Sequence, residues 1–245
     1  MAAGMAAKGL VPVFAVYSSF LQRGFDMLLH DVGLMQLHVV FAVDRAGLVG
    51  EDGETHHGVF DVGYLSQIPG MRIYCPASFA EMRAMLERAV LEDSGPVAVR
   101  YARGGEGAYK GLSHDISECC REGNDITLVS YGVLLNELFT AAELLGRKGI
   151  SAEIIKLNTI SPLDVEAVAA SAEKTGGLLV LEDCVENGSV GQRLTTELAK
   201  RSALPRTILL KNLGNDYTAQ GSVSLLRKAK ALDGASIAAA VEEAL

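Results

Sequence analysis

The residues best suited to chemistry lie between Asp44 and Gly58, in the segment DRAGLVGEDGETHHG. Side chains such as Asp52 and His56 can transfer protons or orient a hydroxyl group. The glycines of the segment allow positive φ angles and a close approach of a ligand to the backbone. A connection inside an α/β unit usually needs only about two to six residues. We therefore predict a functional loop, the alternative being a glycine-rich surface loop with incidental charge.

Cationic and aromatic side chains recur where the expected strands end, namely Tyr17, Arg23, Arg45, Arg103 and the pair His56 and His57. Open parallel α/β sheets bind their ligands at the carboxyl ends of the strands. Arginine holds phosphate or carboxylate through two parallel hydrogen bonds. Each arginine taken singly is more simply a solvated charge. Their occurrence at three separate strand ends, however, predicts a pocket for a small anion.

Other motifs are weaker. Phe20, at a turn from strand to helix, could stack on an aromatic ligand, whereas Phe25 falls on an apolar helix face. The adjacent histidines lack a third spaced ligand, so no metal site is predicted. The segment EDCVENGSVGQ from Glu182 to Gln192 could bind an anion at a helix N-terminus. Its acids and incomplete glycine spacing favour a structural role.

An alternation of strands and helices must position these residues. In the first half we expect strands at 11–18, 37–43, 71–75 and 96–101, and helices at 20–32, at 62–67 and after a capping box of Ser78 and Glu81. In the second half we expect strands at 126–131, 152–157, 178–181 and 207–210, and helices at 134–148, after an N-cap at Ser161, and at 190–200, 222–230 and 236–244. This pattern predicts an α/β protein with two consecutive, mostly parallel sheets flanked by helices.

The loss of periodicity after Arg103 predicts a domain boundary. We expect a first domain at 1–107, a linker at 108–123 and a second domain at 124–245. The opening residues MAAGMAAKG read as the tail of a helix, which predicts a truncated first sheet, the alternative being a frayed terminus.

The composition narrows the class of protein. The 245 residues are 49% hydrophobic and 21% charged, as in soluble globular proteins. A net charge of −8 argues against nucleic acid or an acidic membrane as a partner. No apolar run approaches the ~18 residues of a membrane span, and no signal peptide is recognisable. Four cysteines without a CxxC pair favour a reduced, cytoplasmic setting.

Four motifs together resemble one enzyme family. They are VYSSFLQRGFD from Val16, HDV from His30, DRAGLVGEDGETHHGVFD from Asp44 and VRYARG from Val99. They closely resemble the 1-deoxy-D-xylulose-5-phosphate synthase family, thiamine diphosphate enzymes of the transketolase superfamily. The second half is similar to the general transketolase C-terminal domain. The resemblance implies condensation of pyruvate with D-glyceraldehyde 3-phosphate, release of carbon dioxide, and a place in the synthesis of isoprenoid, thiamine and pyridoxal precursors. It also implies Mg²⁺ as a cofactor and a homodimer.

The resemblance also assigns roles to residues. It implies that Phe20 stacks against the aminopyrimidine ring of the cofactor. Tyr17, Arg45 and Arg103 would hold the phosphate of the acceptor aldehyde. Arg23, Asp52 and His56 would contact the pyruvate-derived intermediate and the acceptor, with His56 transferring a proton.

Some parts of the family pattern are expected to be missing. The glutamate that activates the cofactor would lie just before the segment matched by MAAGMA, and the domain with the GDG…N motif, which binds magnesium and diphosphate, would be absent. Met27 replaces a common glutamine. The resemblance thus implies the C-terminal part of a synthase, lacking its N-terminal domain. Alone, this part is expected to be inactive and to bind thiamine diphosphate poorly.

Two alternatives remain at this point. The chain could be the C-terminal subunit of a split transketolase-type enzyme, with a separate chain supplying the diphosphate domain. It could also be a non-catalytic regulatory or scaffolding module. The retained set of Arg45, Asp52, His56 and Arg103 argues against this second alternative.

Overall fold

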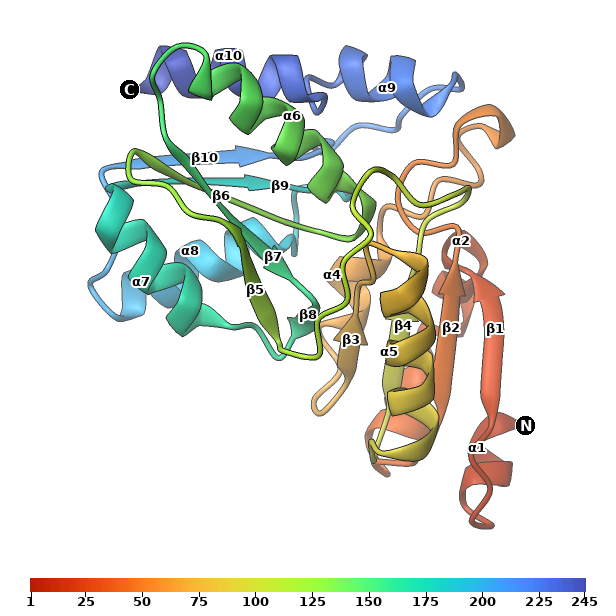
Figure 1. The fold of residues 1–245 in the computed structure, drawn as a ribbon. Coiled ribbons are helices and arrows are strands. Elements are labelled where there is room, and N and C mark those ends of the chain that lie inside the picture. The colour runs from red at the N-terminus through yellow and green to blue at the C-terminus, as the bar shows by residue number, and fades with distance from the viewer.

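The computed structural model describes all 245 residues and contains two five-stranded sheets flanked by helices, as predicted (Figure 1). The first sheet has the order β1 (Val13–Tyr17), β2 (Val40–Asp44), β4 (Val97–Arg100), β3 (Arg72–Tyr74) and β8 (Thr159–Ser161). The first four strands pair in parallel, and β8 pairs antiparallel with β3. We call the first sheet and its helices the first unit, although β8 comes from the second half of the chain.

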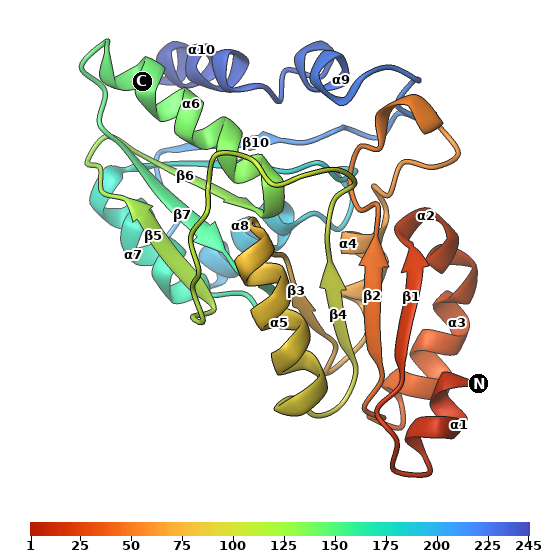
Figure 2. The same cartoon turned by 45° about the vertical axis from the view of Figure 1, so that its right-hand side comes forward.

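The helices of the first unit are α1 (Ala2–Ala6), α2 (Ser18–Leu21), α3 (Phe25–Met27), α4 (Asp61–Leu65) and α5 (Phe79–Leu91). Figure 2 shows α5 on one side of the sheet and α2 and α3 beyond β1. The single helix expected at 20–32 is wrong. A 3-10 turn, Gln22–Gly24, and a π-helical segment, Leu28–Gly33, interrupt it, because Gly24 leaves the helical region at φ −95° and ψ 6°.

The second sheet has the order β10 (Thr207–Lys211), β9 (Gly177–Leu181), β6 (Ile126–Tyr131), β7 (Ala152–Leu157) and β5 (Ser117–Arg121). Only β5 runs antiparallel, along β7. This sheet and its helices form the second unit. Strand β5 lies within the stretch 108–123 that we predicted as a linker, and the division into domains stays a prediction.

The helices of the second unit are α6 (Leu135–Gly146), α7 (Val165–Thr175), α8 (Val190–Lys200), α9 (Val223–Ala229) and α10 (Gly234–Ala244). In Figures 1 and 2, α6 and α10 lie on one side of the sheet and α7 and α8 on the other. The predicted N-cap at Ser161 is wrong. Asp164 caps α7 by accepting a hydrogen bond from the Ala167 amide at 3.1 Å, whereas Ser161 ends β8 and donates to the Met71 carbonyl at 2.8 Å.

A shared apolar core joins the two units. The largest cluster of buried side chains includes Val43 and Cys75 from the first unit together with Val129, Leu157 and Val190 from the second. None of the helices combines the length and the apolar composition that a membrane span requires. All four cysteines are free thiols. At the outer edge of the first sheet, Val13 and Phe14 of β1 remain 52% and 45% exposed.

Candidate active site

The strand register brings the predicted site residues to one edge of the first sheet. Tyr17 at the end of β1 lies beside Asp44 at the end of β2, and Val43 lies beside Arg100 at the end of β4. The segments that follow these strands therefore leave the sheet side by side. They carry Phe20, Arg45 and Arg103, respectively.

Asp52 holds two of the predicted anion-binding arginines. Its carboxylate forms an ion pair with Arg45 and a second one with Arg103, whose Nη1 lies 3.1 Å away. The Arg45 guanidinium also lies over the Tyr17 ring, 4.2 Å from its centroid. The structure thus brings Tyr17, Arg45, Arg103 and Asp52 together. The two guanidinium groups share the Asp52 carboxylate, and Glu51 lies 4.0 Å from Arg103 at the exposed rim.

This cluster borders an open cavity. About 360 Å³ of space lies between Arg45, Arg103 and the N-terminal end of α5. The Arg45 and Arg103 side chains are 24% and 39% exposed, so that an anion can reach them from solvent. Arg45 itself has a φ of +56°, which is uncommon for a residue with a side chain. Such outliers concentrate at functional sites.

An aromatic group lies next to the arginines. Phe20 is 47% exposed, and its ring centroid lies 5.4 Å from that of Tyr17 and 5.3 Å from that of His56. Its open face can accept a flat aromatic ring by stacking. Arg23, by contrast, lies exposed on the turn Gln22–Gly24, without a hydrogen bond or ion pair. The structure therefore does not join Arg23 to the other predicted residues.

The adjacent histidines have different environments, which the sequence did not reveal. His56 is partly exposed beside Phe20, and its Nδ1 lies 2.9 Å from Thr55 Oγ1. His57 is buried at 4% exposure. Its Nδ1 accepts a hydrogen bond from the Val49 amide and its Nε2 faces the Ala219 carbonyl, each at 3.2 Å. Of the two, only His56 has an imidazole that solvent or a ligand can reach.

A buried network beneath the loop was missed by sequence reasoning. Arg100 lies between Asp61 and Asp183, at 2.9 Å and 3.2 Å. Burial raises the pKa of Asp61, and the charge of Arg100 opposes this rise. The apolar strand run containing Arg100 offered no local signal for this contact. The network joins the first unit to the second, because Asp183 follows β9.

In the segment EDCVENGSVGQ, the Glu182 side chain binds the N-terminus of α8. Its buried carboxylate accepts hydrogen bonds from the amides of Val190 and Gly191, at 2.8 Å and 2.7 Å. These are the first amides of α8, which an external anion would need. The N-terminus of α8 is therefore occupied by the protein itself, in agreement with the predicted structural role.

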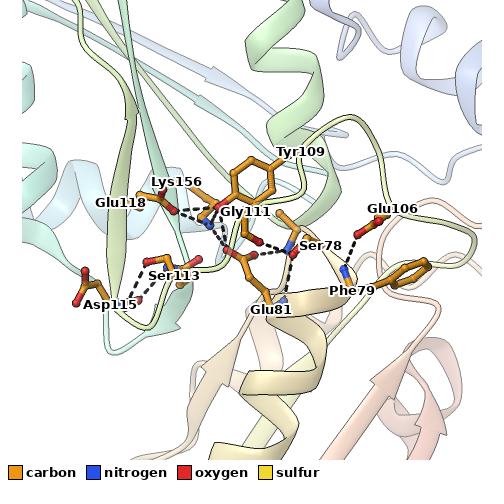
Figure 3. Close-up of polar contacts among 12 residues, drawn as sticks. Ser78, Phe79, Glu81, Glu106, Tyr109, Gly111, Ser113, Asp115, Glu118 and Lys156 are labelled. Carbon is orange, nitrogen blue, oxygen red and sulfur yellow. Dashed lines mark hydrogen bonds and ion pairs between the residues drawn. The ribbon is translucent and has the colours of Figure 1, made fainter.

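A second buried network anchors the segment after Arg103 (Figure 3). Lys156 of β7 pairs with Glu81 of α5 and lies 2.9 Å from Glu118 of β5. The Tyr109 hydroxyl lies 3.0 Å from an oxygen of each carboxylate and shares its single proton between them. Burial and the charges of Glu81 and Glu118 raise the pKa of Tyr109. The Glu81 carboxylate also accepts a hydrogen bond from the Ala77 amide at 2.9 Å. In the expected capping box it would accept from the amide of Ser78, one residue later.

The structure contains one group of side chains that could together hold a metal ion, formed by Cys119, Glu122 and Glu153. Lys174 already pairs with both glutamates. Cys119 and Glu153 lie on β5 and β7 of the second unit, not at the arginine cluster. Sequence reasoning did not identify this group, whose members come from segments far apart in the chain.

Comparisons with known proteins agree with this arrangement. Residues 1–105 match the family described as the transketolase pyrimidine binding domain, and residues 117–237 match the transketolase C-terminal domain. The 1-deoxy-D-xylulose-5-phosphate synthase of Chlorobium luteolum is 40% identical over 99% of this chain and 39% of its own length. That of Polaromonas naphthalenivorans is 42% identical over 98% of this chain and 38% of its own length.

A solved structure shows the same fold. It is described as a split gene transketolase, an inactive β4 tetramer, and superposes with a TM-score of 0.89 at 26% identity, covering 100% of this chain and 79% of that one. The chain spans about 39% of the length of the synthases it matches. It therefore belongs to the transketolase superfamily, with a pyrimidine-binding and a C-terminal domain similar to the C-terminal part of 1-deoxy-D-xylulose-5-phosphate synthases.

Proposed function

We propose that this chain is the C-terminal part of a thiamine diphosphate-dependent 1-deoxy-D-xylulose-5-phosphate synthase. Such an enzyme joins pyruvate to D-glyceraldehyde 3-phosphate and releases carbon dioxide. One observation carries the proposal. Arg45 and Arg103 line one opening, and Tyr17 lies under the Arg45 guanidinium. The exposed Phe20 ring lies beside Tyr17 and beside the accessible imidazole of His56.

The arginines would hold the phosphate of the acceptor aldehyde. Guanidinium groups bind phosphate oxygens through paired hydrogen bonds, and the partly exposed Arg45 and Arg103 have donors available in addition to those used by Asp52. Asp52 would keep the two groups oriented before the phosphate arrives. Arg23 would contact the carboxylate of pyruvate only after its exposed side chain turns toward the cavity.

His56 is the residue we assign to proton transfer. Its Nδ1 faces Thr55 Oγ1 at 2.9 Å, which leaves Nε2 for a ligand. We propose that Nε2 gives a proton to the aldehyde oxygen as the new carbon–carbon bond forms. Histidine suits this role because its ordinary pKa lies near neutral pH.

The residues present fit one part of the cofactor. The exposed Phe20 ring, flanked by Tyr17 and His56, would hold the aminopyrimidine ring by stacking. When bound, thiamine diphosphate supplies the means to stabilise a carbanion. This edge of the sheet offers no cluster of carboxylates for a magnesium diphosphate group. We propose that another part of the enzyme supplies that site.

Such a part has a surface on which to pack. Val13 and Phe14 of β1 expose apolar side chains at the open edge of the first sheet. Exposed apolar patches of this kind mark interfaces. We propose that the N-terminal part of the synthase covers this edge, and that the complete enzyme is a homodimer, which light scattering would measure.

A split enzyme is the second candidate. It is favoured by the similarity to the split gene transketolase chain, which is described as inactive in its β4 tetramer. In that case a separate chain would bring the diphosphate site. Both candidates share the expectation that this chain alone converts no substrate.

Two measurements test the proposed function. The first titrates inorganic phosphate into the chain and follows backbone amide shifts. Replacing Arg103 by Ala is expected to weaken binding about tenfold or more, because a charge-assisted hydrogen bond is lost. Arg83→Ala is the matched control, since Arg83 is an exposed arginine of α5 without an ion pair. Equal phosphate affinity in the wild type and Arg103→Ala would overturn the assignment.

The second measurement is catalytic. The chain is mixed with pyruvate, D-glyceraldehyde 3-phosphate, thiamine diphosphate and Mg²⁺, with and without the N-terminal part of the Polaromonas naphthalenivorans synthase. Product is expected only in the mixture of the two chains. Product formed by this chain alone would contradict the proposal that another part supplies the diphosphate site.

A further inference from the structure

We propose that His57 is a positioning residue. It joins the loop Asp44–Gly58 to the segment 219–223 of the second unit, and we call this contact the latch. The latch sets the geometry of the arginine cluster, which consists of Tyr17, Arg45, Asp52 and Arg103. This inference rests on the proposed function, because it concerns the same anion site. His57 is buried and distinct from the accessible His56.

Both ring nitrogens of His57 are engaged. Nδ1 accepts from the Val49 amide, and Nε2 faces the Ala219 carbonyl, each at 3.2 Å. An amide can only donate and a carbonyl can only accept. These partners therefore assign the neutral form with the proton on Nε2. No nitrogen is left for proton transfer to a ligand, so the role of His57 is to bridge two backbone segments.

Other contacts also join the loop to the segment 219–223. Gln220 Nε2 donates to the Glu51 carbonyl at 2.9 Å. Gly50 packs so closely that an added Cβ would lie 3.1 Å from the Gly221 carbonyl oxygen. The back of the loop thus rests on residues more than 160 positions further along the chain.

One residue connects this latch to the anion site. The Val49 amide donates to His57, and the Val49 carbonyl accepts from Arg103 Nη1 at 3.1 Å. Three residues later, Asp52 pairs with both Arg45 and Arg103. Releasing His57 from Val49 would therefore free the backbone that holds Arg103 in place. The second unit acts on the anion site through this connection, although the site residues themselves belong to the first unit.

Three variants test the latch. His57→Ala removes both hydrogen bonds. His57→Gln can restore them, because an amide side chain carries one acceptor and one donor group. His38→Ala is the matched control, since His38 also contacts a backbone carbonyl, that of Ala89 at 2.8 Å, but lies away from the loop.

Amide hydrogen exchange reads the latch directly. Exchange at Val49 is expected to be about tenfold faster in His57→Ala, to stay close to the wild-type rate in His57→Gln, and to be unchanged in His38→Ala. Nitrogen-15 shifts of the wild-type imidazole should show the proton of His57 on Nε2. Unchanged Val49 exchange in His57→Ala, or a proton on Nδ1, would overturn the latch.

Titration with inorganic phosphate separates positioning from a merely structural role. His57→Ala is expected to weaken phosphate binding about tenfold relative to the wild type, and His57→Gln to restore it. A lower melting temperature with unchanged phosphate affinity would overturn the positioning role. If the wild-type chain binds no phosphate, the proposed function fails, while the exchange at Val49 still decides whether the latch exists.

Discussion

Replacing Lys156 by Met should destabilise the protein more than any surface substitution of a lysine. Lys156 is fully buried and pairs with Glu81, which is also fully buried. Met keeps the length and apolar stem of the side chain but removes the ammonium group. The Glu81 carboxylate then remains inside the protein without its cation.

The structure allows a rough magnitude. Removing one partner of a buried ion pair costs about 3–5 kcal/mol. Glu81 keeps hydrogen bonds from the Ala77 amide at 2.9 Å and from Tyr109 at 3.0 Å, and Glu118 is partly exposed to water. We therefore expect a loss near the lower end, about 3 kcal/mol in the free energy of unfolding. For a chain of this size that corresponds to a fall of roughly 6–12 °C in melting temperature.

Urea unfolding of Lys156→Met, Glu81→Gln and the double variant measures how much the interaction between Lys156 and Glu81 contributes to the free energy of unfolding. The double variant should be more stable than Lys156→Met, because no buried charge is left without a partner. Lys148→Met is the control, since Lys148 pairs with Glu242 at an exposed site and should change stability by less than about 1 kcal/mol. The reasoning is refuted if Lys156→Met matches this control, or if the two single losses simply add in the double variant.

Two further predictions concern pH and packing. Burial opposes the charged form of Glu153, but hydrogen bonds from Lys174, Ser171 and a backbone amide hold its pKa below the ordinary value. The charged Glu153 carboxylate therefore stabilises the protein above about pH 4.3, and this stabilisation is lost as the pH falls through the lower pKa of the folded state. The free energy of unfolding in urea should consequently fall less between about pH 5 and 3 in Glu153→Gln than in the wild type. Gly47→Ala should cost about 3 kcal/mol or more, because φ is +76° and the new Cβ would lie 1.9 Å from an Asp183 oxygen. Gly149→Ala, at φ +82° with no atom within 4 Å, should show only the backbone cost of about 1 kcal/mol, and equal losses would exclude the steric contact.

Local sequence signals located most elements well. The helix predicted at 190–200 is α8 with the same bounds, and the apolar run 152–157 is β7. The helix expected at 20–32 failed for a local reason, at Gly24, but two other errors arose where a distant segment competes with the local signal. Ser161 reads as a helix cap, yet it pairs with Ile73 in the first sheet. Likewise the polar stretch before residue 123 contains β5, because β7 offers it an open strand edge.

The candidate site likewise combines a feature that local sequence indicated with a contact that only folding creates. Arginines placed after apolar strands led us to predict an anion pocket, because parallel strands deliver their carboxyl ends to one edge. The structure brings Arg45 and Arg103 together there but not Arg23, and the pocket itself stays a prediction. The sequence could not show that Asp52 bridges Arg45 and Arg103. That contact depends on how the loop folds back over the sheet edge.

Residue types and their period along the chain therefore determined the α/β class, every strand except β5 and β8, and the loop that carries the site residues. These features depend on neighbours in sequence, which the pattern records directly. Tertiary packing decided which of two adjacent histidines is accessible, and it decided that Lys156 finds Glu81 across 75 positions of the chain. Such choices follow from burial and from partners brought together only by folding, and no local pattern encodes them.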